Sequence, residues 1–197
     1  MRRILLVGFA PATLLTGCSL LSPAPPEPVT AILNKIPDQM QYESSHATLV
    51  VQRLEIRTAY DTTRMAYTMR PYELAYYRDN QWVETPAQMI QPLLVRTLEQ
   101  TGFFRAILNP ADSGPASYAL RTEITELVQD YTTSPPSARL ALHLQLFDET
   151  GQSVAEQEIT ESERMQSSTS YAGVNAANEA LAKALGETAQ FVMSAVR

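Results

Sequence analysis

The stretch of sequence that decides the fold is Arg139-Leu140-Ala141-Leu142-His143-Leu144-Gln145-Leu146-Phe147-Asp148. Four leucines occupy alternate positions, and His143 and Gln145 stand between the last three. Successive side chains of a strand point to opposite faces, so this alternation predicts a β-strand with one face on the core and the other toward solvent.

Further strands are predicted upstream of this segment. In residues 117–130 the side chains expected on one face stand at alternate positions up to Ile124. This alternation shifts by one residue at Leu127-Val128, which indicates a β-bulge. Residues 103–108 predict a short apolar strand.

Downstream, residues 149–152 (Glu-Thr-Gly-Gln) predict a turn into a polar strand near 153–163. A long helix with one apolar side is then expected over 171–196.

A helix is also predicted to begin at Thr85. Threonine is a good N-cap, Pro86 suits the first helical position, Gln88 completes a capping box, and Gly102 suits the C-terminus. Pro92 removes one backbone hydrogen bond inside this helix, so we expect a kink or a later start.

The first part of the domain shows strand patterns in 48–57, 65–70, 73–78 and 81–83. Between the last two, Asp79-Asn80 has the composition of a two-residue hairpin turn.

Taken together, these elements predict an α+β fold with a single antiparallel or mixed sheet covered on one face by two helices, a two-layer sandwich spanning residues 47–197.

The amino terminus resembles a lipoprotein signal. Met1-Arg2-Arg3 is followed by a mostly apolar run from Ile4 to Leu15, which is shorter than the roughly 20 residues of a spanning helix. Leu15-Thr16-Gly17-Cys18 then resembles a bacterial lipobox. We therefore expect residues 1–17 to be a signal peptide and Cys18 to carry the lipid.

Two alternatives explain Cys18 less well, namely a secretory signal with a chance cysteine and a buried structural thiol. Cys18 is the only cysteine of the chain and directly follows the apolar run. A proline-rich segment, residues 22–28, comes next and favours extended polyproline II. Residues 18–46 are accordingly interpreted as the lipidated cysteine and a tether.

The charge of the chain argues against nucleic acid as a partner. The net charge is −6, and removing the signal peptide removes Arg2 and Arg3 and no acidic residue. Nucleic acid and anionic lipid surfaces are bound mainly through Lys and Arg. The lipid anchor is then the feature that keeps an acidic domain at a membrane.

Few residues suggest catalysis. The two histidines, His46 and His143, fall at the margin of the tether and on the polar face of the leucine strand. The carboxylates of the strand near 153–163 are interpreted as a solvated edge: Glu156, Glu158, Glu161 and Glu163. Neither a metal-ligand spacing nor a phosphate loop or nucleophile elbow is present. We therefore expect that the protein is not an enzyme and that it binds neither a metal ion nor a cofactor.

Tyrosines gather around the predicted hairpin, where Trp82 follows them. Such aromatic residues form either a contact surface or a half-buried core. The core interpretation is favoured for Trp82 and Tyr76, and Tyr72 and Tyr77 stay open. The candidate partner-binding residues are Tyr67, Tyr72, Tyr76 and Tyr77.

In these segments the chain resembles the ABC-type transport auxiliary lipoproteins, which include the lipoprotein of the paraquat-inducible system. The segments are Leu74-Ala75-Tyr76-Tyr77, Trp82, Pro86, the helix with Leu94 and Leu98, Gly102-Phe103-Phe104, Leu120, Leu127, Leu146-Phe147-Asp148 and the Ala-rich last helix. Pro92 departs from the pattern of this family.

The resemblance implies a non-enzymatic component of an ABC system that moves phospholipids or other hydrophobic molecules between inner and outer membranes. Its implied partners are an MCE-family periplasmic protein and an ABC permease and ATPase. A structural envelope or secretion adaptor is the alternative, and a homo-oligomer is also left open. Ser19, in place of an inner-membrane retention aspartate, favours the periplasmic face of the outer membrane over the inner membrane.

Replacing Cys18 by serine is expected to abolish lipid attachment, because the thioether bond requires the thiol. Labelling of growing cells with palmitate, followed by isolation of the protein, measures this. The unchanged chain serves as the positive control, and palmitate incorporated into Cys18→Ser would contradict the anchor.

Overall fold

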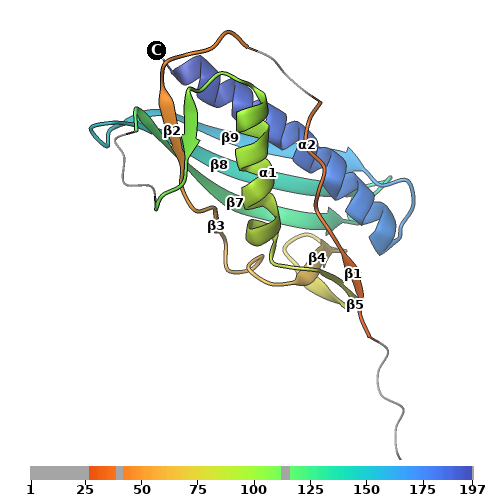
Figure 1. Ribbon diagram of the computed structural model, residues 1–197. Helices are drawn as coiled ribbons and strands as arrows, with labels where there is room; N and C mark the ends of the chain where they lie inside the picture. The colour runs from red at the N-terminus through yellow and green to blue at the C-terminus, as the bar shows by residue number, and fades with distance from the viewer. Residues whose placement is uncertain (1–26, 39–41, 112–115, 197) are drawn as a thin grey trace, which may run out of the picture.

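The leucine strand is β8, Ser137–Asp148, and its four alternate leucines are all buried. The structure is a computed structural model that describes residues 27–38, 42–111 and 116–196. Within these ranges the chain forms one nine-stranded sheet and two helices, α1 (Pro86–Gln100) and α2 (Ser170–Ala195), which both cover the same face of the sheet (Figure 1). The predicted α+β sandwich is confirmed.

The centre of the sheet is β7, Tyr118–Asp130. It pairs antiparallel with β8 along its whole length, and β9, Ser153–Arg164, pairs antiparallel with β8. The predicted bulge is present, but the register shifts between Ile124 and Glu126, slightly before the predicted position.

The other edge of β7 is shared by three short parallel strands that follow one another. They are β2 (Thr48–Val51), β3 (Glu55–Ile56) and β4 (Arg64–Thr68). Beyond β2 lies β6 (Ala106–Leu108), and beyond β4 lie β5 (Ala75–Trp82) and β1 (Val29–Ala31). The strand expected over 48–57 is thus divided in two.

The hairpin turn predicted at Asp79-Asn80 is wrong. Both residues lie inside β5, because this strand continues to pair on both sides, with Asn80 opposite Val29 of β1 and Gln81 opposite Arg64 of β4. The β4–β5 hairpin turns instead through residues 69–74.

Helix α1, Pro86–Gln100, begins where the N-cap prediction placed it and contains Pro92, so the alternative of a later start is wrong. The backbone N–H of Thr85 donates to Gln88 Oε1 at 3.1 Å. Gly102 follows the helix with φ of 63°, a conformation that glycine adopts without steric cost.

Helix α2, Ser170–Ala195, packs on β7, β8 and β9. Thr169 is its N-cap, and its hydroxyl accepts a hydrogen bond from Ala172 N at 3.2 Å. Much of its buried surface is alanine, which allows the helix to approach the leucines of β8 closely.

The folded domain begins before Ala47, where the sequence placed its start. Residues 29–31 form β1, and Leu33 is buried in the core. Asn178 of α2 holds the following residues: its Oδ1 accepts from the backbone N–H groups of Asn34 at 2.9 Å and Lys35 at 3.1 Å. The segment that precedes the predicted boundary is therefore an edge of the sheet and a covering of α2. Residues 1–26, which include the predicted signal peptide and Cys18, lie outside the described ranges.

Trp82, at the end of β5, is 4 % exposed and belongs to the hydrophobic core, as expected. We expect Trp82→Ala to lower the free energy of unfolding by about 3–5 kcal/mol, because it leaves a large cavity. Chemical denaturation followed by circular dichroism measures this.

The neighbouring residue provides the control, since Val83 is 52 % exposed. Val83→Ala should change the free energy of unfolding by less than about 0.5 kcal/mol. Equal effects of the two changes would contradict a packing role for the indole.

Candidate functional site

The four candidate tyrosines belong to the β4–β5 hairpin but point in different directions. Tyr67 lies on β4, Tyr76 and Tyr77 lie on β5, and Tyr72 lies in the turn between the strands. Neighbouring residues of a strand face opposite sides, so Tyr76 and Tyr77 cannot contribute to one surface.

Tyr77 lies on the helix side in a cluster of polar side chains. Its hydroxyl is 2.5 Å from the hydroxyl of Tyr131 and donates to Gln129 Oε1 at 2.9 Å. The ring of Tyr67 packs against it, with 4.6 Å between ring centroids. Burial, together with the hydrogen bond to Tyr131, raises the pKa of Tyr77, so the phenol stays neutral. Tyr67 and Tyr77 thus join β4 and β5 to β7.

The same cluster also fastens the start of α2. Gln129 Nε2 donates to the carbonyl of Ser170 at 3.2 Å, and Gly173 leaves the space that the Gln129 side chain fills. The residues Gln129, Tyr131 and Gly173 were not predicted as a unit, because they are distant in sequence and none carries a recognisable motif.

Tyr76 lies on the opposite face of the hairpin. Its hydroxyl donates to the carbonyl of Ala59 at 2.7 Å, and the guanidinium of Arg64 lies 4.3 Å from the centroid of its ring. Tyr76 therefore holds the segment between β3 and β4. Of the four tyrosines only Tyr72 is fully exposed.

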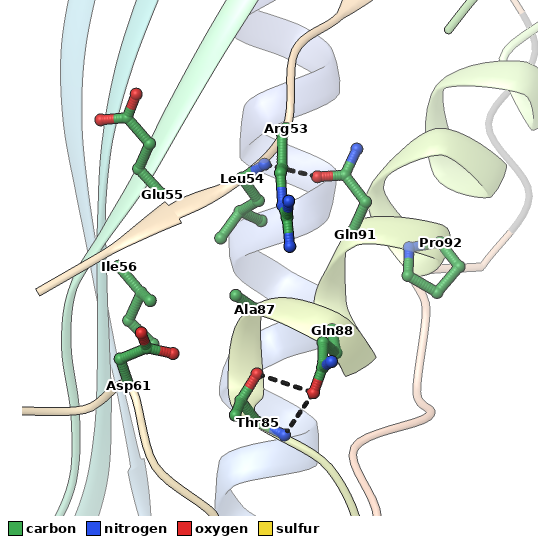
Figure 2. A pocket seen from close by; sticks show the side chains of 10 residues that line it. All are labelled: Arg53, Leu54, Glu55, Ile56, Asp61, Thr85, Ala87, Gln88, Gln91 and Pro92. Atoms are coloured by element: carbon green, nitrogen blue, oxygen red, sulfur yellow. Dashed lines mark hydrogen bonds between the residues drawn. The ribbon is translucent and has the colours of Figure 1, made fainter. Parts of the chain in front are cut away.

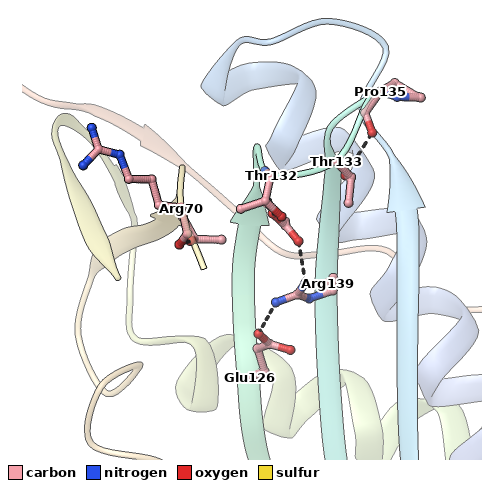
Figure 3. A network of polar contacts seen from close by, with 8 residues as sticks. Arg70, Glu126, Thr132, Thr133, Pro135 and Arg139 are labelled. Atoms are coloured by element: carbon pink, nitrogen blue, oxygen red, sulfur yellow. Dashed lines mark hydrogen bonds and ion pairs between the residues drawn. The ribbon is translucent and has the colours of Figure 1, made fainter. Parts of the chain in front are cut away.

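A groove of about 410 Å³ lies between the hairpin turn and the uncovered face of β7 and β8. Its floor is a charged network, in which Arg139 donates to Glu126 Oε1 at 2.7 Å and also pairs with Asp130 (Figure 3). Asp130 is 1 % exposed and accepts from both the N–H of Thr132, at 2.8 Å, and its hydroxyl, at 2.6 Å. Each charge in this network already has a partner, which suits a structural role.

A cavity of about 770 Å³ lies beside the first turns of α1 (Figure 2). Residues 53–56 line one wall, and α1 residues including Gln88, Gln91 and Pro92 line the other. Gln91 Oε1 accepts from Leu54 N at 2.6 Å, and its Nε2 donates to the carbonyl of Gln52 at 3.4 Å. An amide side chain here makes the contacts that a neighbouring strand would make.

β3 leaves a notch in the sheet at this cavity. Its strand neighbour is β7, and in the described part of the chain no strand lies on its other edge. Sheet edges of this kind pair with extended segments of other chains. The cavity is therefore suited to a peptide.

The histidines and carboxylates show no catalytic arrangement among the residues described. His143 Nε2 lies 2.7 Å from Glu156 Oε1 on the uncovered sheet face, and this contact lowers the pKa of Glu156. His46 is exposed, and no histidine lines any of the cavities given above.

The strand near 153–163 was expected to be a solvated edge, and Glu156 and Glu158 are exposed as expected. Glu161 and Glu163 differ, because they are half-buried against α2. Glu163 pairs with Lys183, and burial together with Glu187 raises the pKa of Glu161 to about 7.

The described residues contain no group of three or more His, Cys, Asp or Glu side chains placed to hold a metal ion. Neither of their helices combines the length and apolar character needed to cross a membrane.

Residues 32–189 match the model of a protein family described as the ABC-type transport auxiliary lipoprotein component. No curated protein matches the chain.

Solved structures resemble the fold. A Xanthomonas campestris protein is 21% identical with a TM-score of 0.71, covering 87% of this chain and 94% of its own. A hypothetical protein from Chlamydia trachomatis is 11% identical with a TM-score of 0.52, covering 75% of this chain and 98% of its own. At these identities the likeness shows the fold alone.

The space at Gly173 gives a test of the tyrosine–glutamine cluster. A Cβ at this position would lie 2.1 Å from Gln129 Cδ, so the glutamine must leave its place. We expect Gly173→Ala to lower the free energy of unfolding by about 1–3 kcal/mol.

The matched control is the same change in a Gln129→Ala background, where the space is free. There Gly173→Ala should be neutral or stabilising, by roughly 0.5–1 kcal/mol, because alanine favours a helix over glycine. Chemical denaturation of the four proteins measures both effects, and an equal cost in both backgrounds would contradict the role assigned to Gln129.

Proposed function

The chain belongs to the ABC-type transport auxiliary lipoprotein family, and we propose from this that it is a non-enzymatic component of a system that moves phospholipids or other hydrophobic molecules between the inner and outer membranes. The observation that carries the proposal is the family match over residues 32–189, which spans most of the folded domain. The partners in this proposal are an MCE-family periplasmic protein and an ABC permease and ATPase.

The anchor in this proposal is a lipid on Cys18. A single acyl chain binds a membrane only weakly, whereas two or more chains give stable attachment. Ser19 supports the outer membrane as the site of attachment. The acidic domain would then stand on the periplasmic face of that membrane.

The role of the domain in this proposal is to hold a partner. Several charged groups on its uncovered sheet face are paired with one another: Arg121 with Glu55, Arg139 with Glu126 and Asp130, and His143 with Glu156. These ion pairs stabilise the fold, so in this proposal the paired groups have a structural role and no chemistry.

The partner's contact surface is proposed to be the cavity beside α1. In this proposal an extended segment pairs with the outer edge of β3, next to the Leu54 N–H and the Gln52 carbonyl that Gln91 already binds, and the side chains of Arg53 and Asp61 give both signs of charge to the walls of the cavity. This mode of binding needs only an extended segment of the partner.

Site-specific photo-crosslinking in cells tests the proposal. A photoreactive phenylalanine analogue at Arg53 or at Pro92, exposed residues of the two walls, is expected to capture an MCE-family protein or an ABC component identified by mass spectrometry. The control position is Val154, an exposed residue at the start of β9, where no capture is expected.

Three outcomes separate the alternatives. Capture of an MCE or ABC component from the cavity and not from Val154 supports the proposal. Capture of this chain itself would identify the cavity as a contact between copies. Capture of neither kind, from protein that is correctly anchored, would overturn the transport role and favour the structural adaptor.

A further inference from the structure

The turn of the β4–β5 hairpin, residues 69–74, exposes apolar side chains that the core does not use. Met69 is 66 % exposed, Leu74 is 39 % exposed, and Tyr72 between them is fully exposed. We refer to these six residues as the hairpin tip. A protein surface seldom groups large apolar side chains in this way without a contact that covers them.

The backbone at Tyr72 strengthens this observation. Its φ is 67°, and it is the one non-glycine residue with positive φ in the described part of the chain. Glycine or asparagine adopts this conformation at lower cost, so a turn with a structural role alone would favour one of them. Tyrosine at this position points to a use for its ring outside the domain.

The base of the tip is held firmly. Tyr131 N donates to the carbonyl of Thr68 at 2.9 Å, and the hydroxyl of Thr68 donates to the carbonyl of Arg70 at 2.8 Å. Tyr76, which follows the tip on β5, donates a hydrogen bond from its hydroxyl to the carbonyl of Ala59. The exposed side chains are thus presented on a rigid support, which lowers the entropy cost of a contact.

The position of β1 shows which end of the domain faces the anchor. β1 is parallel to β5, with Val29 opposite Asn80 and Ala31 opposite Trp82. The chain before Val29 therefore leads back along β5 toward Ala75, where the tip ends. In Figure 1 β1, β4 and β5 lie together at the end of the molecule where the described chain begins.

The length of chain before β1 limits how far this end can stand from a membrane. Ten residues lie between Cys18 and Val29, so the eleven Cα–Cα steps of this connection span at most about 40 Å when fully extended. The far end of the sheet, where β9 starts, is displaced by the length of β7, roughly 40 Å in addition. The tip is at the near end.

The charges around the tip fit a lipid surface. Arg70 and Arg78 are both strongly exposed, and their ion pairs are with adjacent exposed carboxylates, Glu73 at 3.7 Å and Asp79 at 3.1 Å. Exposed pairs of this kind are weak, so the guanidinium groups are free to exchange to lipid phosphates. Tyrosine is also a side chain favoured at the membrane interface, since its ring is apolar and its hydroxyl is polar.

We propose that the hairpin tip, with Met69, Tyr72 and Leu74, contacts the surface of the bilayer that holds the lipid on Cys18. This rests on the anchor of the proposed function. Three side chains of an acidic domain would bind a bilayer only weakly by themselves. The anchor keeps the hairpin tip at a high effective concentration near the bilayer surface. The contact sets the orientation of the domain, with β7 and β8 leading away from the membrane and the cavity beside α1 open to the periplasm.

The test uses the mature, lipidated chain in vesicles of phosphatidylethanolamine and phosphatidylglycerol. Cys18 is the only cysteine, and lipidation blocks its thiol, so the variants Tyr72→Cys and Val154→Cys each carry one reactive thiol. Each variant is labelled with an environment-sensitive fluorophore. Vesicles with and without lipids that carry a quencher near the head group then report contact.

The label at position 72 is expected to be quenched several-fold more by these lipids than the label at 154, which lies at the far end of the sheet. A second variant addresses the strained backbone: with the label at Leu74→Cys, Tyr72→Gly should reduce quenching while the free energy of unfolding is kept or raised, because glycine adopts positive φ freely. Loss of quenching with intact folding then reflects the missing ring.

Each of the other outcomes would contradict either the membrane contact or the lipid anchor. Equal quenching at 72 and 154, or none at 72, in lipidated protein would overturn the membrane contact and leave the anchor standing. Protection of the 72 label that appears only when MCE or ABC proteins are added would assign the tip to a protein and overturn the inference. An unmodified Cys18 in the mass spectrum would overturn the anchor, and the inference with it.

Discussion

The pairing of β7 with β8 is the interaction on which the rest of the structure depends. It runs without a gap in the ladder from Tyr118 opposite Asp148 to Asp130 opposite Ser137, apart from the bulge. One face of this pair carries the leucines that α2 covers, and the free edge of β7 receives three separate segments of the first half of the chain. The strands of the N-terminal half are therefore positioned by β7, which belongs to the C-terminal half of the chain.

The bulge at Thr125 explains how β7 serves two purposes. Before it, Ile124 and its alternates fill the core, and after it the strand is buried on both faces. Gln129 then meets α2 and the tyrosine cluster on one side, while Asp130 and Glu126 meet Arg139 on the other. Burial of Asp130 would be costly by itself, and the hydrogen bonds from Arg139 and Thr132 offset this cost.

The arrangement divides the molecule into surfaces with different properties. The cavity beside α1 is formed where β3 has no outer neighbour among the described strands, and it follows from the shortness of the segments along β7. The hairpin tip is formed by the turn between β4 and β5, which lies beyond the end of β7 because Thr68, the last residue of β4, pairs with Asp130, the last residue of β7. In the two proposals the hairpin tip faces the membrane and the cavity takes a partner, and these two surfaces are formed by different segments of the fold.

Sequence alone determined the elements with local signals: the leucine alternation of β8, the N-cap and C-terminal glycine of α1, the long helix α2 and the existence of a bulge. These depend on periods and caps that are read within a few residues. Only the tertiary structure decided that Asp79-Asn80 is strand, that residues 29–36 join the fold, and that Tyr67, Tyr76 and Tyr77 each contact another part of the domain while Tyr72 is fully exposed. The physical reason is that each depends on a partner far away in sequence: β1 for Asn80, Asn178 for the N-terminal segment, and Gln129 and Ala59 for the tyrosine hydroxyls. Local composition carries no information on which distant group satisfies a hydrogen bond.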